Sequence, residues 1–170
     1  MIESALQRIE EARRRGVIGN YAIGGAIGAM FYMEPFATKD LDVFTLLPVT
    51  ETGMVSLSAV YDHFQALGCK PEGQFLMIEG VRVEFLPPAT PLVAGAIERA
   101  VEKKVGQAQT RVFRAEYLAA IMLQTGRRTD LARLERFLEQ APVNRRSLTV
   151  LLRRHGLLRK WQSFQKRMTE

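Results

Sequence analysis

The sequence predicts an α/β (α+β) fold, in which a mixed β-sheet is flanked by helices and followed by a C-terminal helical bundle. Over the first part of the chain, short apolar or alternating segments typical of strands are interspersed with amphipathic helical segments. From Ala115 onward the apolar spacing is helical throughout, and only glycine and proline interrupt it. We therefore expect an α/β core over residues 1–113 and a helical region, packed on that core, over residues 114–170.

The elements expected in the first half follow from local spacing. Ile2, Leu6 and Ile9 recur at helical spacing among charged residues, and Gly16 ends this first helix. Strands are expected where apolar residues alternate until proline or glycine closes the segment. These strands are 17–23, 40–47, 74–78 and 81–86, and further helices are expected over 26–33 and 55–67.

The second half contains clearer start and stop signals. Glu79-Gly80 predicts a hairpin turn, and Gly106 predicts a second one between alternating segments. Thr90-Pro91 predicts an N-cap and the first residue of a helix that reaches about Glu98. Four more helices are expected over 115–125, 130–140, 145–155 and 157–168, with Thr129 and Asn144 as N-caps.

Composition sets limits on the class of protein. The chain has 170 residues, of which 47% are hydrophobic and 25% are charged, and this suffices for one globular domain with a real core. No apolar run approaches the roughly 20 residues that cross a bilayer, and the charged N-terminus lacks a signal-peptide core. We therefore expect a cytoplasmic protein with no membrane partner. Cys69 is the only cysteine, and the two histidines lie far apart, so neither a disulfide framework nor a zinc site is expected.

The positive charge is concentrated near the C-terminus. The net charge is +6, and after Glu139 the only acidic residue is Glu170. A basic surface of this kind can contact RNA, but it is equally typical of a solvated helix face. The cations of this segment are Arg145, Arg146, Arg153, Arg154, Arg159, Lys160, Lys166 and Arg167.

An acidic pair offers a candidate metal site. Side chains alternate along a strand, so Asp40 and Asp42 should point to one face while Leu41 and Val43 point into the core. Two neighbouring carboxylates repel each other, and a divalent cation such as Mg²⁺, which prefers oxygen ligands, removes that repulsion. The alternative interpretation is an exposed strand end with two solvated aspartates.

A glycine pair precedes the acidic pair. Glycine lets the backbone approach a ligand closely, so Gly24-Gly25 at the start of a helix could bind a phosphate. The alternative interpretation is a tight turn between a strand and a closely packed helix.

A third carboxylate lies on the strand over 81–86. Val81, Val83 and Phe85 share its apolar face, while Arg82 and Glu84 share the polar face. Glu84 can join the aspartate pair if the two strands are neighbours; otherwise it is an ordinary solvent-facing glutamate.

The order of these features resembles the nucleotidyltransferase fold, the polymerase β-like superfamily. A Gly-Gly pair at the start of a helix, Asp-x-Asp on a strand and a third carboxylate on a later strand form the pattern of that family. The finer resemblance is to the AbiEii-type group, which includes the toxin halves of some bacterial toxin–antitoxin pairs. The stretches that carry the resemblance are YAIGGAIGAMFY, TKDLDVF, VRVEFLPP and EYLAAIMLQTGRRTDLARLERFL.

The resemblance implies a reaction. In the family, two metal ions, Mg²⁺ or Mn²⁺, bind a nucleoside triphosphate, an acceptor hydroxyl attacks the α-phosphorus, and pyrophosphate leaves. It implies that Asp40, Asp42 and Glu84 are the metal ligands and catalytic residues, with Glu84 helping to deprotonate the acceptor. It also implies a nucleotide-binding set of Gly24, Gly25, Lys39, Arg127, Arg128 and Asp130.

This chain also departs from the family pattern. Related proteins usually have a lysine where this chain has Met122, and their third carboxylate is more often Asp than Glu. Arg127 and Asp130 match the pattern, and Arg128 is a candidate substitute for the lysine.

Three hypotheses follow. The first is a metal-dependent nucleotidyltransferase that acts on an RNA end, a protein or a small molecule, and that could be a toxin with a cognate antitoxin. The second is a nucleotide- or RNA-binding module of the same fold without turnover, favoured by Met122. The third is a helical RNA-binding protein in which the acidic pair is incidental.

Overall fold

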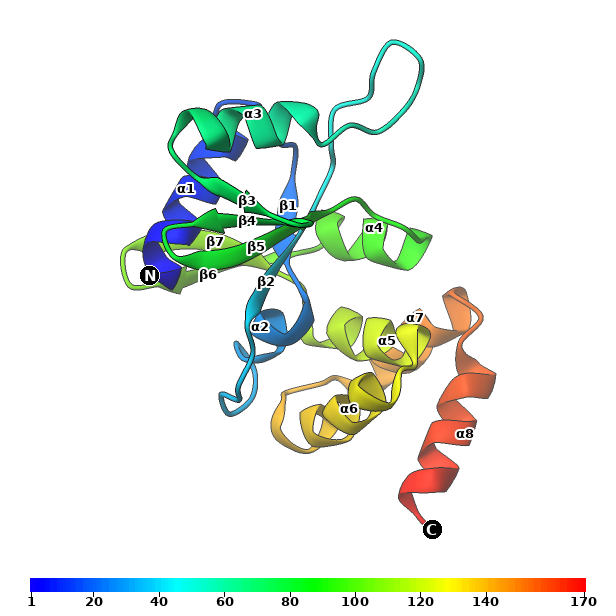
Figure 1. The fold of residues 1–170 in the computed structure, drawn as a ribbon. Helices are drawn as coiled ribbons and strands as arrows, with labels where there is room; N and C mark the ends of the chain where they lie inside the picture. Colours follow the sequence, from blue (N-terminus) through cyan, green and yellow to red (C-terminus); the bar gives the residue numbers. More distant parts are fainter.

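The protein is built on a seven-stranded mixed sheet with eight helices, and the computed structural model describes all residues 1–170 (Figure 1). The predicted mixed α/β class is therefore confirmed. In spatial order the strands are β3 (Lys70–Glu72), β4 (Phe75–Ile78), β5 (Val81–Leu86), β2 (Asp40–Thr45), β1 (Tyr21–Ile23), β7 (Ala108–Val112) and β6 (Val101–Val105).

Helices cover both faces of the sheet. On one face, α1 (Ile2–Arg14) and α3 (Ser58–Ala66) lie over the strands, and on the other lie α2 (Gly25–Ala29), α4 (Pro91–Glu98) and the C-terminal helices (Figure 1). Each face has its own apolar core, because neither layer of helices could bury its apolar side alone. The C-terminal helices are α5 (Ala115–Thr125), α6 (Arg128–Gln140), α7 (Arg145–Arg154) and α8 (Leu158–Met168).

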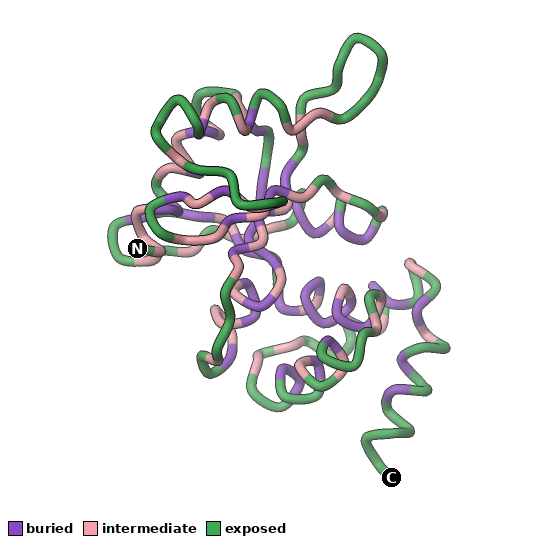
Figure 2. The backbone as a smooth tube through the Cα atoms, in the orientation of Figure 1, coloured by how far each residue is buried: buried purple, intermediate pink, exposed green.

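The C-terminal helices share a core with the sheet. Ala22 of β1, Leu92 of α4 and Leu118 of α5 belong to one cluster of buried side chains that also extends to α7 and α8. Figure 2 shows that α8 is the most exposed of these helices, and its buried side chains are Trp161 and Phe164. The boundary between residues 113 and 114 stays a prediction.

The centre of the sheet places the polar strand residues on one face. β2 runs parallel to β5, and this register pairs Asp40 with Arg82 and Asp42 with Glu84. Burial alternates along β2, where Leu41 is fully buried and both aspartates are partly exposed. The expected common face of the acidic pair is therefore present.

Two predicted elements are shorter in the structure. The strand expected over 17–23 begins only at Tyr21, because Val17 and Ile18 lie in the bend that follows α1, where Val17 N–H donates to Ala12 O at 2.9 Å. The helix expected over 26–33 ends at Ala29. Beyond it the Tyr32 hydroxyl donates to Phe113 O at 2.8 Å, which anchors the chain outside the helix.

One further strand and one helix cap differ from the prediction, and one cap agrees with it. β3 was not expected, because Lys-Pro-Glu has no apolar alternation; it forms by pairing with β4 at the sheet edge. Thr129 is not an N-cap, since α6 begins at Arg128 and Asp130 accepts a hydrogen bond from the Arg127 backbone N–H at 3.3 Å. Asn144 is confirmed as the N-cap of α7, because its Oδ1 accepts from Ser147 N–H at 3.0 Å.

The remaining helices and the two hairpins lie within a few residues of their predicted places. The helix expected over 55–67 spans Ser58–Ala66. None of the eight helices combines the length and apolar character that crossing a membrane requires.

Candidate functional site

A cleft of about 550 Å³ lies between the centre of the sheet and helices α5 and α6. The sheet contributes the three predicted metal-binding carboxylates to its wall, and α2 contributes its first residue, Gly25. The opposite wall contains side chains from α5 and α6, including Met122, Arg127 and Arg133. The structure thus brings the carboxylates Asp40, Asp42 and Glu84 to one cavity.

The glycine turn lies directly against Asp42. The backbone N–H of Gly24 donates to Asp42 O at 3.1 Å. Gly25 has a φ of 57°, and a Cβ on it would collide with Asp42 Oδ2. Only glycine tolerates this backbone conformation and leaves room for the carboxylate. The two motifs that lie apart in the sequence therefore form one structural unit.

Asp42 is the most electrostatically perturbed carboxyl of the cleft. Burial raises the pKa of Asp42 to about 6, and repulsion from Glu84 and Asp40 acts in the same direction. Burial also raises the pKa of Glu84, with a further contribution from Asp40, although the hydrogen bond from Gln74 Nε2 at 3.0 Å acts against it. Mutual repulsion between carboxylates is the condition that a bound cation relieves.

Asp40 has an unsatisfied oxygen. Its Oδ1 is buried and accepts no hydrogen bond, although Arg82 Nε lies 3.2 Å away as an ion pair of poor hydrogen-bond geometry. The Arg82 guanidinium also lies over the Phe75 ring, 4.1 Å from its centroid. A buried carboxylate oxygen that accepts no hydrogen bond is costly, and a cation bound at this position would coordinate it.

The helical wall supplies the positive charge. Arg127 Nε donates to Asp130 Oδ2 at 2.7 Å, and Asp130 itself is only 4% exposed. The Arg133 guanidinium lies 5.3 Å from the centroid of the Phe36 ring. Both arginines act to lower the pKa of Asp42, in opposition to its burial, so their charge reaches the carboxylates across the cleft.

Met122 lies on this wall and is 6% exposed. At the position where the resembling family usually has a lysine, the cleft is therefore apolar. The cations that face the carboxylates come instead from the start of α6.

Three residues predicted to bind nucleotide do not line the cleft. Gly24 packs against the rings of Phe44 and Phe113, and a Cβ added to it would lie 2.6 Å from an atom of each ring. Lys39 is exposed, and its neighbours Thr38 and Asp40 line the cleft, because successive side chains of an extended chain point to opposite sides. Arg128 is exposed on another side of α6, where it borders a hollow with Glu135 and Arg167. From these positions, neither Lys39 nor Arg128 can place a cation in the cleft where Met122 lies.

Two side chains that line the cleft and carry a charged or amide group, Arg133 and Gln74, are not among the site residues that the sequence predicts. Arg133 is three residues beyond Asp130, so helical spacing could have placed it on the same face. Gln74 precedes β4 and reaches Glu84 across the hairpin, and no local pattern indicates this contact.

The carboxylate set fits a divalent cation in its chemistry. All three groups offer oxygen ligands, Asp40 Oδ1 accepts no hydrogen bond, and repulsion among the carboxyls favours neutralisation by a cation. In this structure no three Asp, Glu, His or Cys side chains gather closely enough to share one ion, since Asp40 faces Arg82 and Glu84 faces Gln74. Side-chain rotation at Asp40 and Glu84 would therefore accompany cation binding.

The fold of this chain is similar to that of solved structures, although its sequence matches no known family. No family model matches the chain, and no curated protein matches its sequence. Among solved structures, an antigenic nucleotidyltransferase-like protein from Paracoccidioides brasiliensis is similar, with a TM-score of 0.57, 13% identity, and coverage of 97% of this chain and 90% of that chain.

The antibiotic-resistance factor ANT(2″)-Ia is similar as well. Its solution structure has a TM-score of 0.57 at 10% identity, with 99% of this chain and 97% of that chain covered. A crystal structure of ANT(2″)-Ia in complex with adenylyl-2″-tobramycin has a TM-score of 0.51 at 12% identity, with 95% of each chain covered. The chain therefore has the fold of these nucleotidyltransferase-like proteins.

Proposed function

We propose that the protein transfers a nucleoside monophosphate from a nucleoside triphosphate to an acceptor hydroxyl and releases pyrophosphate. The observation that carries this proposal is the placement of Asp40, Asp42 and Glu84 on one face of two paired parallel strands, against Gly25 and inside one cleft. The fold shared with nucleotidyltransferase-like structures supports it.

The carboxylates are the proposed ligands of a divalent cation, Mg²⁺ or Mn²⁺. When bound, such a cation would neutralise the carboxylates and stabilise charge on the reacting phosphate oxygens. Without it, the triphosphate would meet three negative groups, so we expect nucleotide binding to depend on the metal.

The protein side chains have distinct roles in the proposed step. The acceptor oxygen forms a bond to the α-phosphorus while the bond from that phosphorus to the pyrophosphate oxygen breaks. Glu84 accepts the proton of the acceptor hydroxyl, a role that its raised pKa favours. Arg127 and Arg133 place positive charge opposite the carboxylates, where the departing phosphates need it.

The backbone beside Gly25 leaves little room for a phosphate. The Asp42 carboxylate already occupies the space next to the Gly25 Cα. Because α2 has only five residues, its dipole contributes less than that of the longer helix expected over 26–33. We therefore assign the phosphates mainly to the arginines and the cation.

An RNA acceptor fits the surface next to the cleft. A pocket between the end of α5 and α8 is lined by Arg159, Lys160 and Arg167, and it shares Thr125 with the cleft. Its ionisable side chains are all cationic. An RNA end bound there could extend its terminal hydroxyl toward the carboxylates, and we propose RNA as the acceptor for this reason.

The reaction can be tested directly. The protein is incubated with each labelled nucleoside triphosphate, Mg²⁺, and either total RNA or total protein. We expect label to move to an acceptor with release of pyrophosphate, and we expect Asp42→Ala to abolish it. Asp62→Ala is the matched control, since Asp62 is exposed on α3 and lies outside the cleft. Transfer that persists in Asp42→Ala would refute the assignment.

Met122 favours a second candidate, a nucleotide-binding module without turnover. Its apolar side chain occupies the cleft wall where a phosphate-binding lysine is usual in the resembling family. Calorimetry separates the candidates, because nucleotide binding without pyrophosphate release with any acceptor indicates the module. RNA binding in the absence of any nucleotide binding would instead indicate a helical RNA-binding protein.

The finer resemblance leads us to propose a toxin of the AbiEii-type group, with a cognate antitoxin as partner. Induced expression in a bacterial host should then arrest growth, and Asp42→Ala should remove the arrest. Normal growth at matched expression of the unmodified protein would count against the toxin role while leaving the transfer reaction open.

A further inference from the structure

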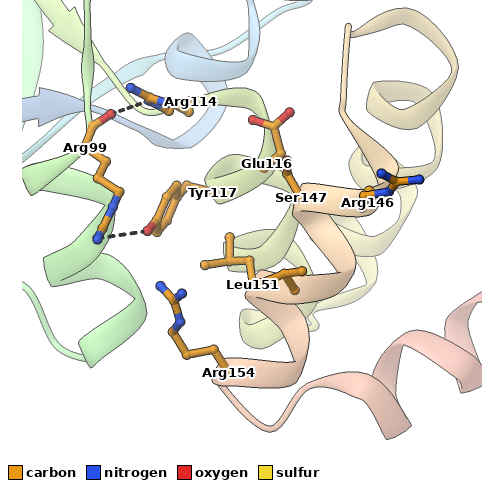
Figure 3. A pocket seen from close by; sticks show the side chains of 9 residues that line it. Arg99, Arg114, Glu116, Tyr117, Arg146, Ser147, Leu151 and Arg154 are labelled. Atoms are coloured by element: carbon orange, nitrogen blue, oxygen red, sulfur yellow. Dashed lines mark hydrogen bonds between the residues drawn. The ribbon is translucent and has the colours of Figure 1, made fainter.

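A second pocket, of about 490 Å³, lies at the N-terminal end of α5 (Figure 3). It is bounded by α4, α5 and α7, and it has no lining residue in common with the cleft. Four arginines line it, and we call it the arginine pocket. They are Arg99, Arg114, Arg146 and Arg154.

The arginines are largely unneutralised. Arg146 and Arg154 are exposed, and their side chains make no hydrogen bond or ion pair within the protein. Arg114 Nε donates to Arg99 O at 2.7 Å, and Arg99 pairs only with the exposed Glu98 at 3.7 Å. These contacts leave most guanidinium donors free for a ligand.

The acidic residue of the pocket is already engaged. Glu116 accepts a hydrogen bond from the Asn144 backbone N–H at 2.7 Å, so it is turned toward the start of α7. The lining therefore has four cations against one carboxylate. Figure 3 shows the side chains of Arg99 and Arg154 extending toward the space beside Tyr117.

Two helices begin at this pocket. Arg114 is the N-cap of α5, and Tyr117 lies in its first turn. Arg146 and Ser147 lie in the first turn of α7. The partial positive charge of both helix ends adds to that of the arginines, and it favours an anion.

The floor of the pocket is apolar and belongs to the buried core. Tyr117 and Leu151 are both 6% exposed, and the Tyr117 hydroxyl accepts a hydrogen bond from Arg99 Nη1 at 3.4 Å. Val150, which is 47% exposed, borders the same space. A ligand that combines anionic groups with an apolar or planar part would match both surfaces.

We propose that the arginine pocket binds a phosphate group, carried either by a small phosphorylated molecule or by an RNA strand. A phosphate offers more acceptor oxygens and more charge than a carboxylate, so it can engage guanidinium groups from both α4 and α7 at once. The site goes beyond the proposed transfer reaction, because it is separate from the cleft and requires no divalent cation.

The test measures anion binding in EDTA, so that metal-dependent nucleotide binding in the cleft does not contribute. Calorimetry is carried out with pyrophosphate, and fluorescence anisotropy with a labelled single-stranded RNA 12-mer. The variants are Arg154→Gln and the double variant Arg146→Gln/Arg154→Gln. The matched control is Arg153→Gln, since Arg153 is exposed in the same helical turn but does not line the pocket.

We expect Arg154→Gln to weaken binding by about tenfold and the double variant to weaken it further, because hydrogen bonds to charged groups are the strong ones. Arg153→Gln should change binding by less than about twofold, since its exposed charge does not line the pocket and is screened by salt. Asp42→Asn should leave binding unchanged, which separates this site from the transfer reaction.

The outcomes are distinct. Arginine-dependent binding of pyrophosphate identifies a compact phosphate ligand, whereas arginine-dependent binding of the RNA alone identifies a strand. Equal weakening by Arg153→Gln and Arg154→Gln would overturn the proposal in favour of diffuse surface charge. It would also be overturned if an oligoglutamate peptide bound more tightly than either phosphate probe with the same arginine dependence, or if neither probe bound.

Discussion

At the scale of single residues, Gly25 and Asp42 define the cleft together. The glycine has a left-handed φ of 57°, and its Cα faces the Asp42 carboxylate so closely that no side chain fits between them. Position 25 therefore requires glycine so that the Asp42 carboxylate can occupy its place in the cleft.

Replacing Gly25 by alanine tests this coupling. We expect Gly25→Ala to lower the free energy of unfolding by about 1–3 kcal/mol, through left-handed strain and displacement of Asp42, and to abolish transfer. Urea unfolding and the transfer assay measure the two effects. Gly53→Ala is the control, since Gly53 has a φ of 80° and a Cβ added there would meet nothing within 4 Å, so this variant carries the strain without the collision. Equal behaviour of the two variants would contradict the coupling.

Asp42 also predicts a pH dependence of the metal-free protein. Its pKa rises from 3.8 in the unfolded chain to about 6 in the folded protein, so the folded state binds the proton more tightly. The stability that this proton contributes is present below 3.8 and is lost as the pH rises through about 6. A difference of this size corresponds to roughly 3 kcal/mol.

Asp42→Asn should remove this dependence. In EDTA, we expect the variant to be more stable than the unmodified protein at pH 7.5, by up to the same roughly 3 kcal/mol, and to lose the advantage near pH 4. Urea unfolding at both pH values measures the difference. Parallel stability profiles of the two proteins would show that burial does not perturb Asp42.

At the scale of elements, a helix or strand could be predicted from the sequence when residues close together in the chain form it. α4 begins where Thr90 and Pro91 predict, because Thr90 caps Val93 N–H through a contact of only three residues. β3 could not be predicted, because its pairing with β4 forms it. The early end of α2 depends on Tyr32 bonding to Phe113, a contact across 81 residues.

At the start of α6, Asp130 forms the capping hydrogen bonds, and Thr129, the expected N-cap, does not. Asp130 is buried and accepts hydrogen bonds from the backbone and the side chain of Arg127. We expect Asp130→Ala to lower the free energy of unfolding by about 1–3 kcal/mol, because it removes the cap and leaves these donors without an acceptor. Thr129→Ala, at the cap position expected from the sequence, should change it by less than about 0.5 kcal/mol. Denaturant unfolding of both variants decides between them, and a larger loss for Thr129→Ala would restore Thr129 as the cap.

At the scale of the whole molecule, the cleft joins the sheet to the C-terminal helices. Carboxylates come from β2 and β5, and arginines come from α6 and the turn before it. A ligand held by both walls would stabilise the packing of the two regions against each other.

Thermal unfolding should report this joint binding. With Mg²⁺ and a nucleoside triphosphate at about 100 times the dissociation constant, the folded state gains roughly 2.7 kcal/mol. For a chain of this length, that gain raises the Tm by about 5–10 °C. EDTA or Asp42→Ala should abolish the increase, because the carboxylates then repel the triphosphate or can no longer hold the cation. An equal increase in EDTA would show that binding does not use the carboxylate site.

The sequence by itself determined the features that rest on local rules. Alternation along a strand places Asp40 and Asp42 on one face, and capping chemistry and glycine turns locate α4, α7 and both hairpins. Tertiary structure alone decided which distant side chains meet. Pairing of β2 with β5 sets Glu84 beside Asp42, and packing of α5 and α6 on the sheet turns Met122 and Arg133 toward them. The arginine pocket has the same origin, because its four cations come from three separate parts of the chain that only the packed core brings together.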